Sequence, residues 1–219
     1  MDRLAALGIL DHTENLVKKL SVFPKGLSPS REEKLDLLAK AISDSINHSN
    51  KAEVIVICTH NSRRSHIGQL MLKLAAICHN LGNVFTYSGG TEATAMNVRV
   101  ARALKDHGLE VKQLTEGLNP KYYIPLVDND PLLDIHFSKP YDNSYNPQQG
   151  FIAVMVCDDA DEACPVVAGA TYRISLPYID PKISDDTEDE RKIYYDKVIE
   201  IGREMFLVMD KVKKMSGTA

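Results

Sequence analysis

The most constraining stretch of this 219-residue chain is an apolar strand that runs straight into a polar loop and then into an amphipathic helix. The strand covers residues 53–57, the loop runs from Cys58 to Arg64 and Ser65, and the helix is expected over about 65–80. At such a turn, successive backbone N–H groups and the positive end of the helix dipole point to one place. An arginine there can bind two oxygens of a tetrahedral anion side-on. The pattern therefore predicts an oxyanion cradle next to a cysteine.

Cys58 is the reactive group that this arrangement predicts. A helix N-terminus and nearby guanidinium groups favour the thiolate form of a cysteine, and the thiolate is the nucleophile. The alternative is that Cys58 is a buried strand-end cysteine and that Arg63 and Arg64 are solvated loop charges, since buried structural cysteines are common. A donor-rich loop with arginine at this offset, followed at once by an amphipathic helix, favours the nucleophile.

The composition indicates a soluble globular protein and excludes several other classes. A net charge of −4 without a long basic run argues against nucleic-acid binding, so any anion must be bound by a local pocket. The apolar stretches are too short to span a bilayer and the N-terminus lacks a signal-peptide pattern, so we expect a cytoplasmic protein without membrane contact. There, cysteines are more typically reactive or buried than paired in a disulfide framework. The four are Cys58, Cys78, Cys157 and Cys164, and Cys78 is expected in the core.

Apolar strands alternate with helices from residue 53 onward, which predicts an α/β fold with a parallel sheet covered by helices on both faces. Further strands are expected at 84–88, 151–156 and 172–176, and helices at 97–107 and from about 187 to 212. The predicted organisation is an N-terminal helical extension, residues 1–50, followed by an α/β domain, residues 51–219.

The extension reads as two helices. Candidate N-caps with an acidic residue three positions on are Asp11 with Glu14 and Ser30 with Glu33. The second helix has apolar residues at near-helical spacing: Leu35, Leu37, Leu38, Ala41 and Ile42. We expect a packed element that serves in dimerisation or as a lid. Residues 115–150, with a candidate hairpin turn at 128–131, are expected to form an insertion over the active-site face.

Strand 151–156 ends in a second cysteine-bearing segment, in which an Asp-rich stretch separates Cys157 from Cys164. The C-terminal ends of neighbouring parallel strands share one edge, so Cys157 should emerge on the same side as Cys58, where two thiols can exchange. No His or Cys pair with metal-ligand spacing accompanies them, so no metal site is predicted. The alternative is that Cys157 and Cys164 are both structural.

Asp180 follows the last predicted strand, again on the loop side of the sheet. A carboxyl group at this place can act as a general acid for the oxygen that leaves as Cys58 attacks. An Asp-Pro turn is also a commonplace loop. The interpretation of Asp180 as an acid therefore depends on the presence of Cys58 and Arg64 on the same edge of the sheet.

Together these motifs resemble the low-molecular-weight protein tyrosine phosphatase superfamily and, within it, the thioredoxin-coupled arsenate reductase branch. The resemblance covers about residues 53–214 and implies a four-stranded parallel sheet with flanking helices. It implies that Cys58 is the nucleophile, that Cys157 and Cys164 are resolving thiols, and that Asp180 is the acid. The implied anion loop is Thr59, His60, Asn61, Ser62, Arg63, Arg64 and Ser65, braced by Asn61 and Ser88.

The resemblance also implies an activity: reduction of arsenate through a Cys58, Cys157 and Cys164 relay, with thioredoxin as electron donor and no bound cofactor. One alternative is a phosphatase that hydrolyses phosphotyrosine or small phosphoesters through a phosphocysteine. Another is a non-catalytic module that binds oxyanions. A homodimer through the N-terminal helices is a further expectation.

Three positions depart from the family pattern. The family's reductases usually have glycine in place of His60, and often cysteine in place of Arg63. Gln69 stands where some members have a glutamate for a potassium site, which puts that site in doubt here.

Overall fold

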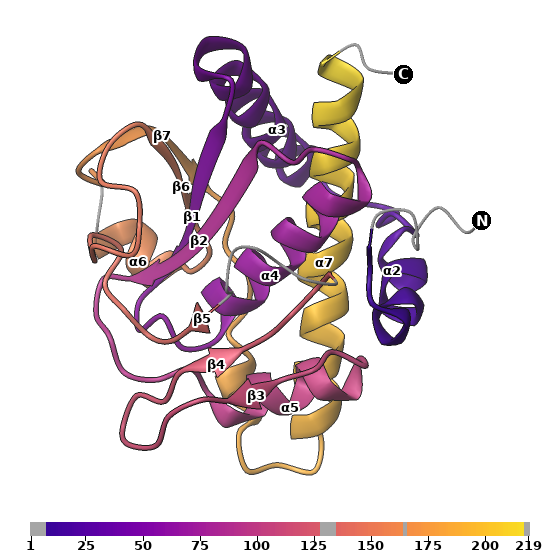
Figure 1. Ribbon diagram of the computed structural model, residues 1–219, viewed down its shortest axis with the longest axis vertical. Helices are drawn as coiled ribbons and strands as arrows, with labels where there is room; N and C mark the ends of the chain where they lie inside the picture. The colour runs from indigo at the N-terminus through magenta and orange to yellow at the C-terminus, as the bar shows by residue number, and fades with distance from the viewer. Residues whose placement is uncertain (1–7, 128–134, 164–165, 217–219) are drawn as a thin grey trace.

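The computed structural model describes residues 8–127, 135–163 and 166–216, and its centre is a four-stranded parallel sheet (Figure 1). The strand order is β2-β1-β6-β7, and each neighbouring pair is parallel. The strands are β1 (Ala52–Cys58), β2 (Val84–Gly90), β6 (Phe151–Met155) and β7 (Ala170–Ser175). The α/β fold with a four-stranded parallel sheet is therefore confirmed, and its strand ends meet at one edge.

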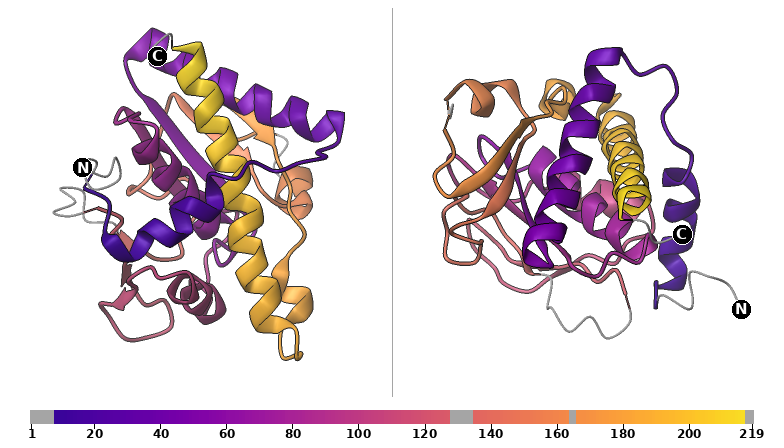
Figure 2. Two further views of the ribbon diagram at one scale, coloured as in Figure 1. Left: turned by 90° about the vertical axis from the view of Figure 1, so that its right-hand side faces the viewer. Right: turned by 90° about the horizontal axis from the view of Figure 1, so that it is seen from above.

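Helices flank this sheet in layers. They are α2 (Glu14–Leu20), α3 (Pro29–Ser49), α4 (Arg64–Cys78), α5 (Val98–Asp106), α6 (Asp158–Ala163) and α7 (Glu190–Met215), with short 3-10 turns η1 (Asp11–Thr13) and η2 (Pro181–Ser184). Helix α4 packs on β1 and β2, while α6 contacts β1 and β6. Seen from above, α3 lies between the sheet and α7, and α2 lies on the outer side of α7 (Figure 2).

Helix α3 belongs to the core of the fold. It packs against β1, β6, β7 and α7, and it buries Leu35, Leu38, Ala41 and Ile42. Leu37, predicted on the same face, is instead 48% exposed, because its side chain is on the solvent side of the helix. The N-terminal extension is packed, as predicted, because the buried side chains of α3 belong to the same hydrophobic core as those of the strands.

The predicted helix starts are wrong in this region. Ser28, not Ser30, caps α3: its Oγ accepts a hydrogen bond from Arg31 N at 3.2 Å, and Pro29 occupies the first turn. Proline is tolerated at that position because a backbone N–H in the first turn would have no partner within the helix. The helix therefore begins two residues earlier than the pairing of Ser30 with Glu33 predicts. Asp11 makes no side-chain cap, since it lies inside η1.

The segment predicted as an insertion lies beside the end of β2. It contains β4 (Tyr122–Tyr123) and β5 (Ile135–His136), which form a small antiparallel sheet with β3 (Lys112–Gln113). Beyond β5, Lys139 O accepts from Gly90 N at 3.0 Å and Tyr141 N donates to Gly90 O at 2.9 Å. The predicted hairpin turn at 128–131 lies outside the described residues.

Cys78, at the end of α4, is partly buried and packs against the core, as predicted. Within the described ranges, no helix is long and apolar enough to cross a membrane.

Candidate active site

The loop from Cys58 to Arg64 joins β1 to α4 at the C-terminal edge of the sheet. Asn61, at its centre, is fully buried and has φ = 43°, a left-handed conformation that asparagine tolerates better than most residues. Gly90 approaches the loop so closely that a Cβ there would lie 2.6 Å from Thr59 O and 2.7 Å from Asn61 N. Only glycine fits at that place, and the end of β2 therefore holds the loop in its tight shape.

Cys58 is buried at the bottom of this loop, 4% exposed, with Sγ 3.1 Å from Ser65 Oγ. Ser65 Oγ also accepts a hydrogen bond from Asn61 Nδ2 at 2.8 Å. Because a hydroxyl has a single hydrogen to donate, the Asn61 contact leaves that hydrogen free to point at Cys58. The Cys58 sulfur can accept this hydrogen bond, so Ser65 fixes the position of the sulfur in the loop.

Arg64 and Asp180 meet above the cysteine. Arg64 Nη2 lies 2.6 Å from Asp180 Oδ2, and Nη1 donates to Tyr178 O at 2.8 Å. Asp180 caps η2, with Oδ1 accepting from Lys182 N at 3.0 Å, and its side chain is 32% exposed. A small pocket is lined by Cys58, Thr59, His60, Ser62, Arg63, Arg64 and Asp180. The structure thus brings together most of the loop residues and the predicted acid.

The Nε–H group of Arg64 is not used by these contacts. Its Nε is buried and has no hydrogen-bond partner in the described part of the chain. A buried donor without a partner costs free energy, which a bound oxyanion would recover.

A buried histidine, His66, braces the loop, and the sequence prediction missed it. His66 Nε2 lies 2.9 Å from Asn61 O, and Nδ1 lies 3.4 Å from Ser88 Oγ. Ser88 therefore supports the loop through His66, while Asn61 Oδ1 accepts from Lys139 N at 2.9 Å. The one signal in the sequence is a histidine in the first turn of the helix, two residues after Arg64.

His66 is neutral in the folded protein. Burial, and then the nearby Lys139, lower the pKa of His66 to about 3 from 6.5. Asn61 O can only accept, so Nε2 carries the proton and Nδ1 accepts from Ser88.

We therefore expect an acid-dependent loss of stability that His66→Gln reduces. The unfolded chain binds a proton at His66 below about pH 6.5, whereas the folded chain does not until about pH 3. The contribution of the neutral His66 to the free energy of unfolding is fully present above pH 6.5. As the pH falls between those values, this contribution decreases by up to about 1.4 kcal/mol per pH unit. Urea unfolding of both proteins at pH 7.5, 6, 5 and 4 measures the slopes. Equal slopes would contradict the neutral, buried His66.

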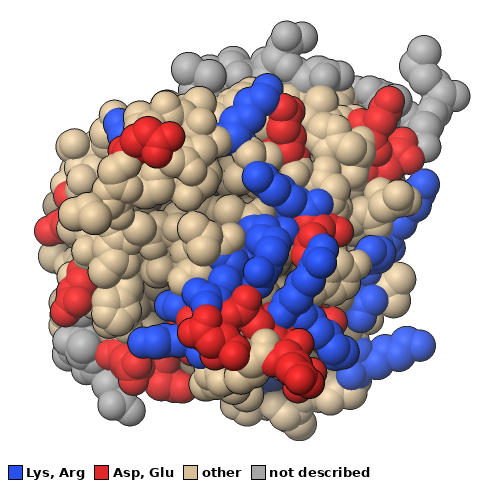
Figure 3. Space-filling view, turned by 90° about the horizontal axis from the view of Figure 1, so that it is seen from below, with Lys and Arg blue, Asp and Glu red and all other residues tan. Residues whose placement is uncertain are grey.

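Arg63 points away from the cradle. Its Nε donates to Tyr194 Oη at 2.7 Å and its Nη2 to Asp185 Oδ2 at 2.8 Å, while Tyr194 Oη donates to Asp185 Oδ1 at 2.6 Å. Arg63 is among the residues that line the pocket, but its guanidinium nitrogens are bound to Tyr194 of α7 and to Asp185 before it. Figure 3 shows Lys and Arg side chains interleaved with Asp and Glu on the underside of the molecule.

His60 is the exposed member of the loop, with Nε2 3.6 Å from Glu92 Oε2. Its backbone O accepts from Ser138 Oγ at 2.9 Å, so the segment after β5 also contacts the loop. The position that is usually glycine in the family's reductases thus places a side chain at the rim.

Cys157 lies on the predicted edge. It follows β6, it is buried, and its Sγ lies 3.4 Å from Thr59 Oγ1, the residue after Cys58. Val156 N donates to Ile57 O at 2.8 Å, which aligns the two strand ends. Cys157 immediately precedes α6, which Ser175 Oγ anchors through Asp161 Oδ2 at 2.6 Å. Cys164 lies outside the described residues.

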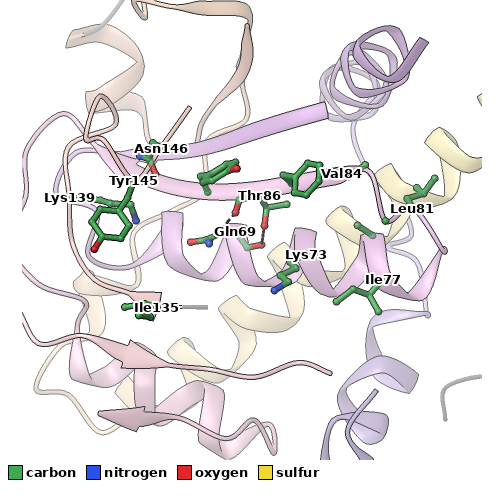
Figure 4. Close-up of a pocket in the computed structure, with 14 residues that line it drawn as sticks. Gln69, Lys73, Ile77, Leu81, Val84, Thr86, Ile135, Lys139, Tyr145 and Asn146 are labelled. Atoms are coloured by element: carbon green, nitrogen blue, oxygen red, sulfur yellow. Dashed lines mark hydrogen bonds between the residues drawn. The ribbon is translucent and has the colours of Figure 1, made fainter. Parts of the chain in front are cut away.

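Gln69 faces a second pocket, of about 420 Å³, that lies between the outer side of α4 and β2 (Figure 4). Its Nε2 donates to Thr86 O at 3.2 Å, and Thr86 Oγ1 donates to Gln69 O at 3.2 Å. Gln69 thus fastens α4 to the edge strand. No cluster of His, Cys, Asp or Glu suited to a metal ion occurs among the residues that the structure describes.

Known proteins with similar sequences include bacterial arsenate reductases. No protein-family model matches the chain. The arsenate reductase of Bacillus licheniformis is 23% identical over 150 residues, 68% of this chain and 88% of that protein. Arsenate reductase 1 of Staphylococcus epidermidis is 28% identical over 141 residues, 64% of this chain and 86% of that protein. At 23% to 28% identity, the chain is thus distantly similar to bacterial arsenate reductases.

Solved structures of low-molecular-weight phosphatases also align with the chain. The phosphotyrosine phosphatase of Vibrio cholerae O395 is 12% identical with a TM-score of 0.49, and the alignment covers 76% of this chain and 99% of that one. The protein tyrosine phosphatase of Bacillus subtilis is 16% identical with a TM-score of 0.48, covering 74% and 97%.

Proposed function

We propose that this protein belongs to the low-molecular-weight phosphatase superfamily and is an arsenate reductase that works through a thiol–disulfide relay. The observation that carries the proposal is the meeting of Cys58, Arg64 and Asp180 in one pocket, with Cys157 against the same loop through Thr59. Only the relay uses the second thiol. The distant sequence relatives that are arsenate reductases support the same choice.

The first step is attack of the Cys58 thiolate on arsenic(V). The loop amides and Arg64 hold the arsenate oxygens, and Arg64 Nε supplies the donor that has no partner in the described residues. Asp180 protonates the oxygen that departs as water, so a Cys58 S–As bond forms as an As–O bond breaks. The 2.6 Å contact of Arg64 with Asp180 keeps both groups at the mouth of the pocket.

The second step transfers electrons. The Cys157 thiolate attacks Cys58 Sγ, the electron pair of the S–As bond stays on arsenic, and arsenite leaves. Arsenic gains two electrons and the two sulfurs lose them as the Cys58–Cys157 disulfide. Cys164 then attacks Cys157, which releases Cys58 as a thiolate and forms the Cys157–Cys164 disulfide. Thioredoxin, a dithiol, reduces the Cys157–Cys164 disulfide and returns the two electrons.

The phosphatase alternative shares the first half of this chemistry. Attack of Cys58 on a phosphoester gives a phosphocysteine that water hydrolyses, and Cys157 has no role in turnover. Cytoplasmic location, the thioredoxin donor and dimerisation through the N-terminal helices remain predictions.

One experiment separates the two activities. Thioredoxin, thioredoxin reductase and NADPH are supplied with arsenate, and aryl phosphate hydrolysis is measured in parallel. For the relay, Cys157→Ser and Cys164→Ser should each stop multiple turnovers of arsenate and leave aryl phosphate hydrolysis intact. Cys164→Ser should still complete one reduction and accumulate the Cys58–Cys157 disulfide, visible by mass spectrometry. Wild-type arsenate turnover in both variants, or none in the wild type, would refute the reductase.

A further inference from the structure

We propose that Arg31, in the N-terminal helix α3, is a positioning residue that holds the acid-bearing segment 177–180 against the active-site loop. The N-terminal extension would then support catalysis directly. The effect on turnover rests on the proposed role of Asp180, whereas the hold on the segment does not.

Arg31 reaches from the first turn of α3 into a buried cluster. Its Nε and Nη2 donate to Glu204 Oε1 and Oε2 of α7 at 3.0 and 2.7 Å, a side-on pair. Its Nη1 donates to Pro177 O at 2.8 Å, and its guanidinium carbon lies 4.4 Å from the centre of the Tyr178 ring. A single side chain therefore contacts both the backbone and the ring of the segment before Asp180.

Tyr178 is held at its hydroxyl as well. It is 4% exposed, and its Oη donates to Glu204 Oε2 at 2.6 Å. Burial first, and then the charge of Glu204, raise the pKa of Tyr178 well above its usual 10, so the phenol remains a donor. Arg31 and Tyr178 thus share one buried carboxylate, and the three groups form a closed cluster.

The cluster leads directly to the catalytic pocket. Tyr178 O accepts from Arg64 Nη1 at 2.8 Å, and two residues later Asp180 contacts Arg64 Nη2. The backbone between Pro177 and Asp180 therefore lies between Arg31 on one side and Arg64 on the other. Because the proton donor must be within about 3 Å of the leaving oxygen, a displacement of roughly 1 Å here would cost about a hundredfold in rate.

A second ion pair between α3 and α7 provides the matched control. Asp36 pairs with Lys211 across the same two helices, but Asp36 is 55% exposed and neither side chain hydrogen-bonds to segment 177–180 within the described residues. Loosening α3 from α7 in general would affect both pairs. Of the two pairs, only that of Arg31 holds the acid.

The test compares Arg31→Lys with Asp36→Asn. Lysine keeps a charge beside Glu204 but loses the side-on pair and the bond to Pro177 O. We expect kcat to fall about ten- to hundredfold with KM changed less than about threefold, while Asp36→Asn keeps wild-type values. In the Asp180→Asn background, Arg31→Lys should lower kcat no further, because the group it positions is already gone. A merely structural effect would persist in that background.

Hydrogen exchange gives a readout that does not need activity. The backbone amides of Tyr178, Ile179, Asp180 and Lys182 should exchange faster in Arg31→Lys and not in Asp36→Asn; the Lys182 N–H is the one that donates to Asp180 Oδ1. If Arg31→Lys fails to fold, the double variant R31M/E204Q removes the buried charge with its partner and serves instead. Unchanged exchange in this segment overturns the proposal. Changed exchange with an inactive wild type would refute the proposed function and leave the hold of Arg31 standing.

Discussion

Replacing Cys58 with serine should abolish both arsenate reduction and aryl phosphate hydrolysis. Both activities that we weigh begin with attack by the Cys58 sulfur, which lies 3.1 Å from Ser65 Oγ in the pocket that Arg64 and Asp180 also line. A serine hydroxyl keeps its proton at neutral pH, and its neighbour Ser65 is a hydroxyl that cannot serve as a general base. Turnover should fall below detection with either substrate.

The fold should survive this substitution, which makes the loss interpretable. Serine is close to cysteine in size, so we expect a shift in the thermal midpoint of only a few degrees, from a change of about 1 kcal/mol. Cys78→Ser is the matched control, because Cys78 packs at the end of α4 away from the pocket lining. That variant should retain wild-type rates. Residual turnover by Cys58→Ser above the level of a no-enzyme blank would mean that another residue is the nucleophile.

The elements that sequence reasoning predicts correctly have signals that are local. An apolar run bounded by a polar loop gives β1, and the helix predicted over 97–107 corresponds to α5, which the structure caps with Asn97, whose Oδ1 accepts from Arg99 N at 2.9 Å. The common edge of parallel strands follows from topology, so the placement of Cys58, Cys157 and Asp180 at one edge of the sheet can be expected from the order of strands and loops along the chain. The start of α3 cannot be predicted in this way, because Ser28 and Ser30 are both suitable N-cap residues.

What the sequence cannot reveal depends on contacts between distant segments. His66 reads as an ordinary helix residue until Asn61 O and Ser88 lie on either side of its ring. Arg31 and Glu204 are 173 positions apart, and each alone resembles a solvated charge on a helix. The loop pattern predicts that Arg63 faces the anion, yet Asp185 and Tyr194 turn its side chain toward α7. Buried polar groups need partners, and no spacing rule identifies a partner so far along the chain.

Asp180→Asn should slow turnover by roughly a hundredfold to ten-thousandfold, the usual contribution of a positioned general acid. Asparagine keeps the shape of the side chain and its Oδ1 can still accept from Lys182 N, so the cap of η2 should persist. What is lost is the ability to donate a proton and, in the ionised form of Asp180, the negative charge beside Arg64. The loss should be largest for phenyl phosphate, whose phenolate is a poor leaving group without a proton. It should be smallest for 4-nitrophenyl phosphate, whose nitrophenolate leaves readily without one.

Asp185→Asn supplies the comparison for that test. It also removes a carboxylate paired with a loop arginine, but Asp185 faces Arg63 and Tyr194 instead of the pocket. We expect its rate loss to be equal for the two phosphates, because a displaced Arg63 would disturb the loop without removing the acid. The ratio of the two rates, measured for each variant under saturating substrate, is therefore the decisive quantity. If Asp180→Asn lowers both rates by the same factor, Asp180 stabilises Arg64 and a different group protonates the leaving oxygen.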